Sequence, residues 1–171
     1  EYSICGGAAY DKYGEPLPKE SLDKCLNSDS VLLGAVGGPQ YDSLPYEKRP
    51  ERALLGVRKA MGLYANLRPA KLFDALADVC PLKHAKNIDM LVVRELIGGI
   101  YFGEKGVREG KYGREGYDVM CYGELEVERI CRTAFELAQK RRGKVSSVVK
   151  ANVLKTSGIW RKVVHDIHED Y

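Results

Sequence analysis

Three arginines lie among apolar neighbours and are the first candidates for chemistry. Arg58 belongs to a segment with helical spacing, and Arg68 and Arg94 each belong to a short apolar run. A partly buried guanidinium group requires an anionic partner, and its planar fork matches the two oxygens of a carboxylate. For any one arginine, an ion pair with a nearby acid of the same chain is the simpler interpretation. Three on successive elements favour a site for a di- or tricarboxylate.

Lys150 and Tyr122 are candidates for proton transfer. Lys150 lies in the β-branched run of residues 144–153, where burial would lower the pKa of its amine and suit it to acid–base work. Solvation at the edge of a sheet is the competing interpretation. Tyr122 follows a glycine-rich stretch and precedes a helical pattern, so its hydroxyl either faces a cleft, where it would donate a proton, or only packs. From the residues alone, packing is the better interpretation of Tyr122.

Other short motifs give little support for a phosphate or metal site. The glycine-rich residues 34–39 do not fit GxGxxG, and no helical pattern begins directly after them, so a dinucleotide phosphate loop is not supported. His165 and His168 are three apart on an expected helix, but no third ligand lies nearby in the sequence. A solvated helix face explains the two histidines better than a metal.

The elements that must position these residues alternate between strand and helix. Alternating or unbroken apolar runs predict strands at residues 2–5, 30–36, 65–73, 90–96 and 144–153. A polar loop is expected between the first strand and residue 18. Helical spacing predicts helices at residues 21–26, 51–62, 124–142 and around 160–167. This order predicts an α/β architecture with a mainly parallel or mixed sheet.

Residues 101–122 alternate tyrosine, glycine and charge without a helical period. Glycine turns within such a stretch predict a β-ribbon or extended arm. An arm of this kind often meets another subunit, so we expect the segment to contribute to an oligomer.

The composition argues against several classes of protein. The 27 basic and 24 acidic residues are scattered, apart from a basic cluster at residues 140–142 that ends an expected helix, so we expect no nucleic-acid partner. No apolar run approaches the ~20 residues of a membrane span, so we expect no membrane partner. The 5 cysteines form no CxxC pair, which favours reduced thiols in the cytoplasm. The first residue is Glu1 and the last interrupts an amphipathic pattern, so both ends are expected to be incomplete.

Six sequence strings carry a specific resemblance. In chain order they are LGAVGGP at residues 33–39, RPE at 49–51, LLGVRK at 54–59, YANLRPAK at 64–71, VRELIGGIYFGE at 93–104 and KANVL at 150–154. Together they resemble the isopropylmalate dehydrogenases, within the wider isocitrate/isopropylmalate family of metal-dependent β-decarboxylating dehydrogenases. The resemblance covers essentially the whole chain.

The resemblance implies an oxidative decarboxylation. Enzymes of the family transfer a hydride from the hydroxyl-bearing carbon to NAD, release carbon dioxide and protonate the remaining enol. By motif, Arg58, Arg68 and Arg94 would bind the malate carboxylates. Lys150 would assist deprotonation of the hydroxyl, and Tyr122 would give the proton to the enol. The lysine of this family reaches the site of the partner subunit, so a homodimer is implied.

The resemblance also implies a substrate preference. Leu54 and Leu55 would contact the isopropyl group of the substrate, with Val153 nearby, whereas relatives that act on isocitrate have polar residues here. Burial of a branched alkyl group contributes roughly 1.5–3 kcal/mol, while a carboxylate stranded against leucines costs more. The expected substrate is therefore 3-isopropylmalate, in leucine biosynthesis. A tartrate, homoisocitrate or isocitrate dehydrogenase and a non-catalytic dimerising module are the alternatives.

The cofactors implied are NAD and Mg²⁺ or Mn²⁺. The segment from Gly38 and Pro39 to Glu51, together with Asn152, would approach the nicotinamide. The family's metal-binding aspartates lie downstream of Tyr171, so no metal ligand is assigned in this chain, which we expect to be inactive alone. Residues 1–64 would belong to an incomplete large domain for cofactor and substrate, and residues 65–171 to a smaller dimerisation domain with the arm at about 101–122.

Overall fold

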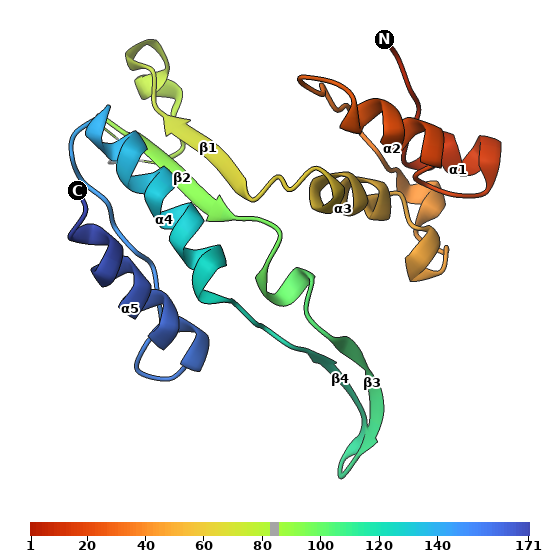
Figure 1. The fold of residues 1–171 in the computed structure, drawn as a ribbon. Coiled ribbons are helices and arrows are strands. Elements are labelled where there is room, and N and C mark those ends of the chain that lie inside the picture. Colours follow the sequence, from red (N-terminus) through yellow and green to blue (C-terminus); the bar gives the residue numbers. More distant parts are fainter. Residues whose placement is uncertain (83–85) are drawn as a thin grey trace. The chain divides into compact units, whose positions relative to one another are not determined.

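A computed structural model of the chain describes residues 1–82 and 86–171 (Figure 1). Contacts within the chain divide it into two compact units, Glu1–Leu63 and Tyr64–Tyr171. In the part of the chain that the structure describes, no helix has both the length and the apolar character needed to cross a membrane.

The first unit is built from three α-helices and two short 3-10 turns. Two helices confirm the sequence prediction, because helical spacing at residues 21–26 and 51–62 marks them closely. Pro50 lies directly before the first turn of the third helix, a position that needs no amide hydrogen. In chain order the elements are α1 (Gly7–Tyr13), α2 (Lys19–Leu26), η1 (Pro39–Tyr41), η2 (Tyr46–Lys48) and α3 (Glu51–Ala60).

The predicted strands at residues 2–5 and 30–36 are wrong, and α1 lies within the polar loop that was predicted between the first strand and residue 18. The backbone N–H of Gly7 donates to the carbonyl of Val36 at 2.7 Å, so the second segment binds a helix start instead of a neighbouring strand. A strand requires a partner strand for its backbone hydrogen bonds. The described residues of this unit offer none.

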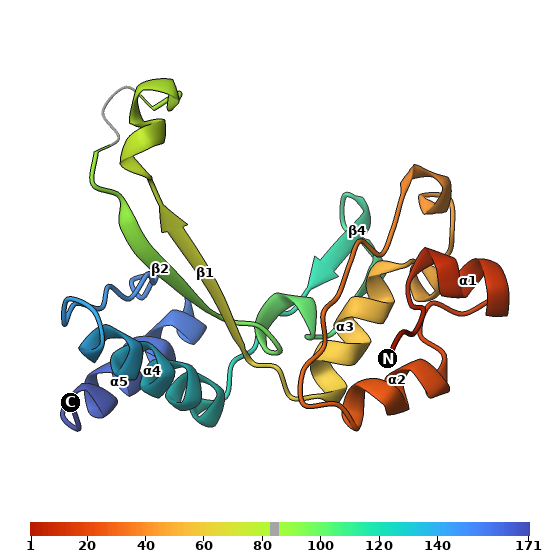
Figure 2. The same ribbon diagram turned by 90° about the horizontal axis from the view of Figure 1, so that it is seen from above.

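The second unit contains two antiparallel hairpins and two helices. Strand β1 pairs along its whole length with β2, and β3 pairs with β4 to form the predicted ribbon. Figure 2 shows β1 and β2 as one long twisted ribbon. In chain order the elements are β1 (Ala65–Lys71), η3 (Asp74–Val79), β2 (Asp89–Glu95), η4 (Gly99–Tyr101), β3 (Lys105–Gly110), β4 (Gly113–Asp118), α4 (Glu124–Gln139) and α5 (Lys155–His168).

The α/β class is confirmed, but the described residues form no parallel sheet, since both sheets are two-stranded and antiparallel. The predicted strand at residues 144–153 is also wrong. Residues 144–150 have no strand partner in the described ranges, and Val148 is 96% exposed. β-Branched residues favour a strand only where neighbours pack against them.

The core of the second unit lies between α4 and α5. Both helices place an apolar stripe inward, as the sequence predicts, and α4 also packs against β2. Tyr64, Val93 and Trp160 extend this core at its border. The buried cluster consists of Val127, Ile130, Cys131 and Phe135 of α4 with Val163 and Ile167 of α5.

Cys131 provides a test of this packing. Burial raises the pKa of its thiol to about 11, so at pH 8 the thiol stays protonated and unreactive. We expect Cys121, which is exposed, to be alkylated by iodoacetamide while Cys131 stays unmodified in the folded chain. Mass spectrometry of tryptic peptides measures both, and denatured protein serves as the control in which both react. Equal labelling in the folded chain would contradict the packing of α4.

Candidate functional site

The pairing of β1 with β2 brings two of the predicted arginines onto one face of the ribbon. Arg94 lies opposite Asn66, and Arg68 lies opposite Val92, so the two arginines are diagonal neighbours on the same side. The Nε of Arg68 donates to the side-chain oxygen of Asn66 at 2.7 Å. The guanidinium of Arg94 lies 5.1 Å from the centre of the Tyr101 ring, which restricts its direction. Two cations held in this way are suited to a substrate with more than one carboxylate.

Tyr122 lies half-buried just before α4. Its ring meets that of Trp160 edge to face, with 5.3 Å between the ring centres. Burial raises the pKa of the Tyr122 hydroxyl above its ordinary value, the carboxylate of Glu95 raises it further, and Arg94 acts in the opposite direction. Glu126 adds a smaller upward effect. The hydroxyl therefore stays protonated at neutral pH, as a proton donor must.

Arg94 and Tyr122 line the same groove in the second unit. The groove has a volume of about 630 Å³ and runs between β2, α4, α5 and residues 144–148. Glu95 and Trp160 also line it, together with apolar residues of the two helices. The structure thus places a predicted carboxylate ligand and the predicted proton donor beside a common space.

Lys150 is not where the sequence placed it. It lies in the turn before α5, where its backbone N–H donates to the hydroxyl of Ser157 at 3.1 Å and its carbonyl accepts the N–H of Val153 and Leu154. Its side chain is exposed, so the interpretation of Lys150 as a residue inside a strand is wrong. Asn152 and Val153 belong to the same turn, and Val153 is 66% exposed. The groove that holds Arg94 and Tyr122 is not lined by this turn.

The remaining substrate candidates lie on α3 in the first unit. Ala53 and Val57 form the buried face of this helix, and Leu54, Leu55 and Arg58 lie half-buried beside it. Leu54 and Arg58 are four residues apart, which places them on one side of the helix. An apolar side chain next to a cation is the combination that an acid with an alkyl group requires.

The predicted nicotinamide contacts in the first unit form a loop beside a carboxylate. Pro39 begins η1, and the carbonyl of Gly38 accepts the N–H of Tyr41 at 3.0 Å. A Cβ placed on Gly37 would lie 3.1 Å from a carboxylate oxygen of Glu51, so this backbone approaches Glu51 closely. A carboxylate accepts hydrogen bonds from an amide such as that of nicotinamide, so the group fits the chemistry of the loop.

A metal does not fit the part of the chain that the structure describes. Within residues 1–82 and 86–171, no group of three or more histidines, cysteines, aspartates or glutamates could hold one. His168 of α5 instead packs against Phe135, with 5.8 Å between the ring centres.

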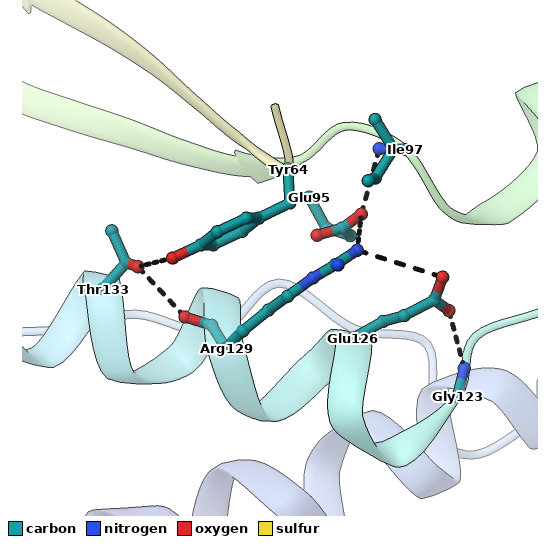
Figure 3. A network of polar contacts seen from close by, with 7 residues as sticks. All are labelled: Tyr64, Glu95, Ile97, Gly123, Glu126, Arg129 and Thr133. Atoms are coloured by element: carbon teal, nitrogen blue, oxygen red, sulfur yellow. Dashed lines mark hydrogen bonds and ion pairs between the residues drawn. The ribbon is translucent and has the colours of Figure 1, made fainter. Parts of the chain in front are cut away.

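Sequence reasoning missed two charged residues next to the site. Glu95 ends β2 with a side chain that is 1% exposed, and its carboxylate binds Arg129 of α4 at 3.0 Å (Figure 3). Strand alternation was the available signal, because it places Glu95 on the same side as the apolar Val93. A carboxylate on an apolar face must find a cation or hydrogen-bond donors there.

Proteins of known sequence match nearly the whole chain. The 3-isopropylmalate dehydrogenase of Clostridium pasteurianum is 56% identical over 169 residues, which are 97% of this chain and 47% of that protein. The 3-isopropylmalate dehydrogenase of Aquifex aeolicus is 53% identical over 171 residues, covering 98% of this chain and 47% of that protein. The chain therefore spans about half the length of these relatives.

Solved structures show the same likeness. Isocitrate dehydrogenase from Methylococcus capsulatus matches with a TM-score of 0.73 and 30% identity, over 99% of this chain and 48% of that one. A β-decarboxylating dehydrogenase from Thermococcus kodakarensis matches with a TM-score of 0.70 and 32% identity, over 99% of this chain and 46% of that one. Residues 1–171, the whole of this chain, also match the family model described as isocitrate/isopropylmalate dehydrogenase. The chain belongs to the isocitrate/isopropylmalate dehydrogenase family.

Proposed function

We propose that the chain is the substrate-recognition part of an NAD-dependent 3-isopropylmalate dehydrogenase, which oxidises and decarboxylates 3-isopropylmalate in leucine biosynthesis. The observation that carries the proposal is the groove that both Arg94 and Tyr122 line, together with the electrostatic effect of the Arg94 cation on the pKa of the Tyr122 hydroxyl. The identity of 56% to a 3-isopropylmalate dehydrogenase supports the choice of substrate.

Each candidate residue has a role in this proposal. Arg58, Arg68 and Arg94 bind the carboxylates of the substrate. Tyr122 holds a proton for the enol that remains after carbon dioxide has left. Lys150 accepts the proton of the substrate hydroxyl. Its exposure in the turn before α5 leaves it accessible to a second copy of the chain, and the proposal includes a homodimer in which it reaches the partner's site.

The apolar residues of the site set the substrate preference. Leu54 and Leu55, together with Val153, would surround the isopropyl group. Burial of this group contributes roughly 1.5–3 kcal/mol, and a third carboxylate at the same place would lose its hydration without a partner. The proposal therefore favours 3-isopropylmalate over isocitrate.

NAD is the proposed hydride acceptor. Gly38, Pro39 and Glu51 in the first unit and Asn152 in the second would contact its nicotinamide. The described residues provide no metal cluster, so the Mg²⁺ or Mn²⁺ of the family's chemistry has no assigned ligand in this part of the chain. Residues 1–64 would serve cofactor and substrate, residues 65–171 would serve dimerisation, and the cytoplasm is the proposed location.

A chimera tests the proposal. The chain replaces the matching segment of the Clostridium pasteurianum 3-isopropylmalate dehydrogenase, to which it is 56% identical. We expect the chimera to form NADH from 3-isopropylmalate with Mg²⁺ at a rate within about tenfold of the parent enzyme. This corresponds to a rise of at most about 1.4 kcal/mol in the activation free energy. Absorbance of NADH measures the rate, and the chain by itself is the control that should form none.

Two results would contradict parts of the proposal. Faster turnover of isocitrate or tartrate by the chimera would overturn the substrate assignment. A chimera that folds and dimerises but forms no NADH with any of these acids would overturn the catalytic role and favour a non-catalytic dimerising module.

A further inference from the structure

An ion pair joins the buried carboxylate of Glu95, which lines the groove, to the partly exposed guanidinium of Arg129. One carboxylate oxygen of Glu95 accepts both the backbone N–H of Ile97 and the Nη2 of Arg129, each at 3.0 Å (Figure 3). The guanidinium of Arg129 lies 4.8 Å from the centre of the Tyr64 ring, whose hydroxyl lies 3.2 Å from that of Thr133. The end of β2, the turn after it and α4 are therefore joined through one carboxylate.

The turn that Glu95 holds is in contact with Tyr122. Gly99 has a φ of 74°, and its N–H donates to the carbonyl of Cys121 at 3.0 Å. A Cβ on Gly99 would lie 2.2 Å from the Tyr122 hydroxyl, so that hydroxyl lies directly against the glycine backbone. Any movement of the turn at Ile97–Gly99 must displace the hydroxyl.

Arg129 also lies near Glu126 in the first turn of α4. Glu126 accepts the N–H of Gly123 at 2.8 Å, which fixes the first turn of the helix. The other oxygen of Glu126 lies 3.9 Å from Arg129. The guanidinium of Arg129 thus contacts two carboxylates. Glu95 holds the turn that contacts Tyr122, and Glu126 holds the backbone of Gly123, the residue after Tyr122.

The Glu95–Arg129 pair has the features expected of residues that position their neighbours. Glu95 and Arg94 are consecutive on β2 and point to opposite faces, so the direction of Arg94 depends on how Glu95 is held. The second carboxylate oxygen of Glu95 and the Nε of Arg129 are buried without a hydrogen-bond partner among the described residues. An ion pair with a buried carboxylate and unsatisfied buried atoms contributes little net stability, whereas removal of Arg129 would leave the Glu95 charge buried without its cation.

We infer that Glu95 and Arg129 are positioning residues, which hold the Tyr122 hydroxyl and Arg94 in a fixed relation through the Ile97–Gly99 turn. This inference rests on the proposed function, in which Tyr122 gives a proton to a substrate bound by Arg94. Neither Glu95 nor Arg129 needs to touch the substrate.

The test compares Glu95→Gln and Arg129→Met with a matched control on α4. Glu128→Gln removes the carboxylate that pairs with Arg132 at 2.9 Å, away from the turn. In the chimera, we expect Glu95→Gln and Arg129→Met to lower kcat about 10- to 100-fold, because small misplacements of a catalytic group have effects of this size. KM should change far less, and Arg129→Lys should recover part of the loss. Glu128→Gln should leave kcat unchanged.

Two further measurements on the chain itself do not depend on activity. Hydrogen exchange at the amide of Ile97 should become about fivefold faster in Glu95→Gln and stay unchanged in Glu128→Gln. The neutral amide oxygen of glutamine still accepts the Ile97 N–H, but a hydrogen bond to it is weaker than one to a carboxylate by about 1 kcal/mol. The pKa of Tyr122, followed by NMR of ¹³C-labelled tyrosine, should fall in Glu95→Gln. The charged groups acting on it are Glu95 and Arg94 from β2 and Glu126 from α4, and the variant removes one that raises the pKa.

Specific results would overturn the inference. The inference is overturned if Glu95→Gln and Glu128→Gln have equal kcat and equal exchange at Ile97. It is also overturned if both Glu95→Gln and Arg129→Lys unfold, because the pair would then stabilise the fold in general. An inactive unsubstituted chimera would instead contradict the proposed function. In that case the exchange and titration results on the chain would still show whether Glu95 holds the turn and Tyr122 in place.

Discussion

Replacement of Tyr122 by phenylalanine in the chimera is expected to lower kcat by about 10²- to 10⁴-fold, the range typical for loss of a general acid. The ring of phenylalanine keeps the edge-to-face contact with Trp160, so the local packing is retained and the hydroxyl alone is lost. Since the hydroxyl acts after the substrate has bound, KM should stay within about threefold. Tyr13→Phe, at a half-exposed site on α1, is the control and should retain full activity.

The dependence on pH separates proton donation from packing. Burial and Glu95 raise the pKa of Tyr122, so its hydroxyl remains protonated up to and beyond the ordinary value of about 10. Activity that needs this proton is present below the raised pKa and is lost as the pH rises through it. The alkaline decline of kcat should therefore lie above pH ~10 on account of Tyr122 and be absent in Tyr122→Phe. Unchanged kcat in Tyr122→Phe would exclude the hydroxyl as the donor.

Helices and local hairpins could be predicted from the sequence because their signals are local. The apolar stripe of residues 124–142 identifies α4, and the glycines between residues 101 and 122 identify the ribbon of β3 and β4. The strands expected at residues 30–36 and 144–153 failed for the opposite reason. Their apolar β-branched residues have a high strand propensity, but a strand also depends on a partner that the propensity does not supply.

Candidate site residues could be selected from the sequence, but their arrangement could not. Arg68 and Arg94 could be selected singly, whereas their common face follows from the β1–β2 register, which the sequence does not state. Lys150 was expected in a strand, either buried or solvated at a sheet edge, because its neighbours are apolar, yet it lies exposed in a turn. Glu95 and Arg129 are 34 residues apart, and only the packing of α4 on β2 brings their charges together.

Replacement of Arg94 by alanine is the second change with a large expected effect. A charged hydrogen-bonding partner removed from a binding site costs about 2–4 kcal/mol, so kcat/KM of the chimera for 3-isopropylmalate should fall by about 30- to 700-fold. Most of the loss should appear in KM, because the cation binds the substrate both before and during the reaction. Arg161→Ala, at an exposed position on α5, is the control and should leave kcat/KM unchanged.

Arg94→Lys distinguishes the geometry of Arg94 from its charge. Lysine keeps the cation but loses the planar fork and its stacking on Tyr101, which lies 5.1 Å from the guanidinium. If the fork binds a carboxylate with two hydrogen bonds, kcat/KM of Arg94→Lys should still be reduced about tenfold or more, equivalent to about 1.4 kcal/mol. Recovery of full activity by lysine would mean that Arg94 acts only through its charge. Full activity of Arg94→Ala would remove Arg94 from the site and, with it, the main support for the groove as the place where the substrate binds.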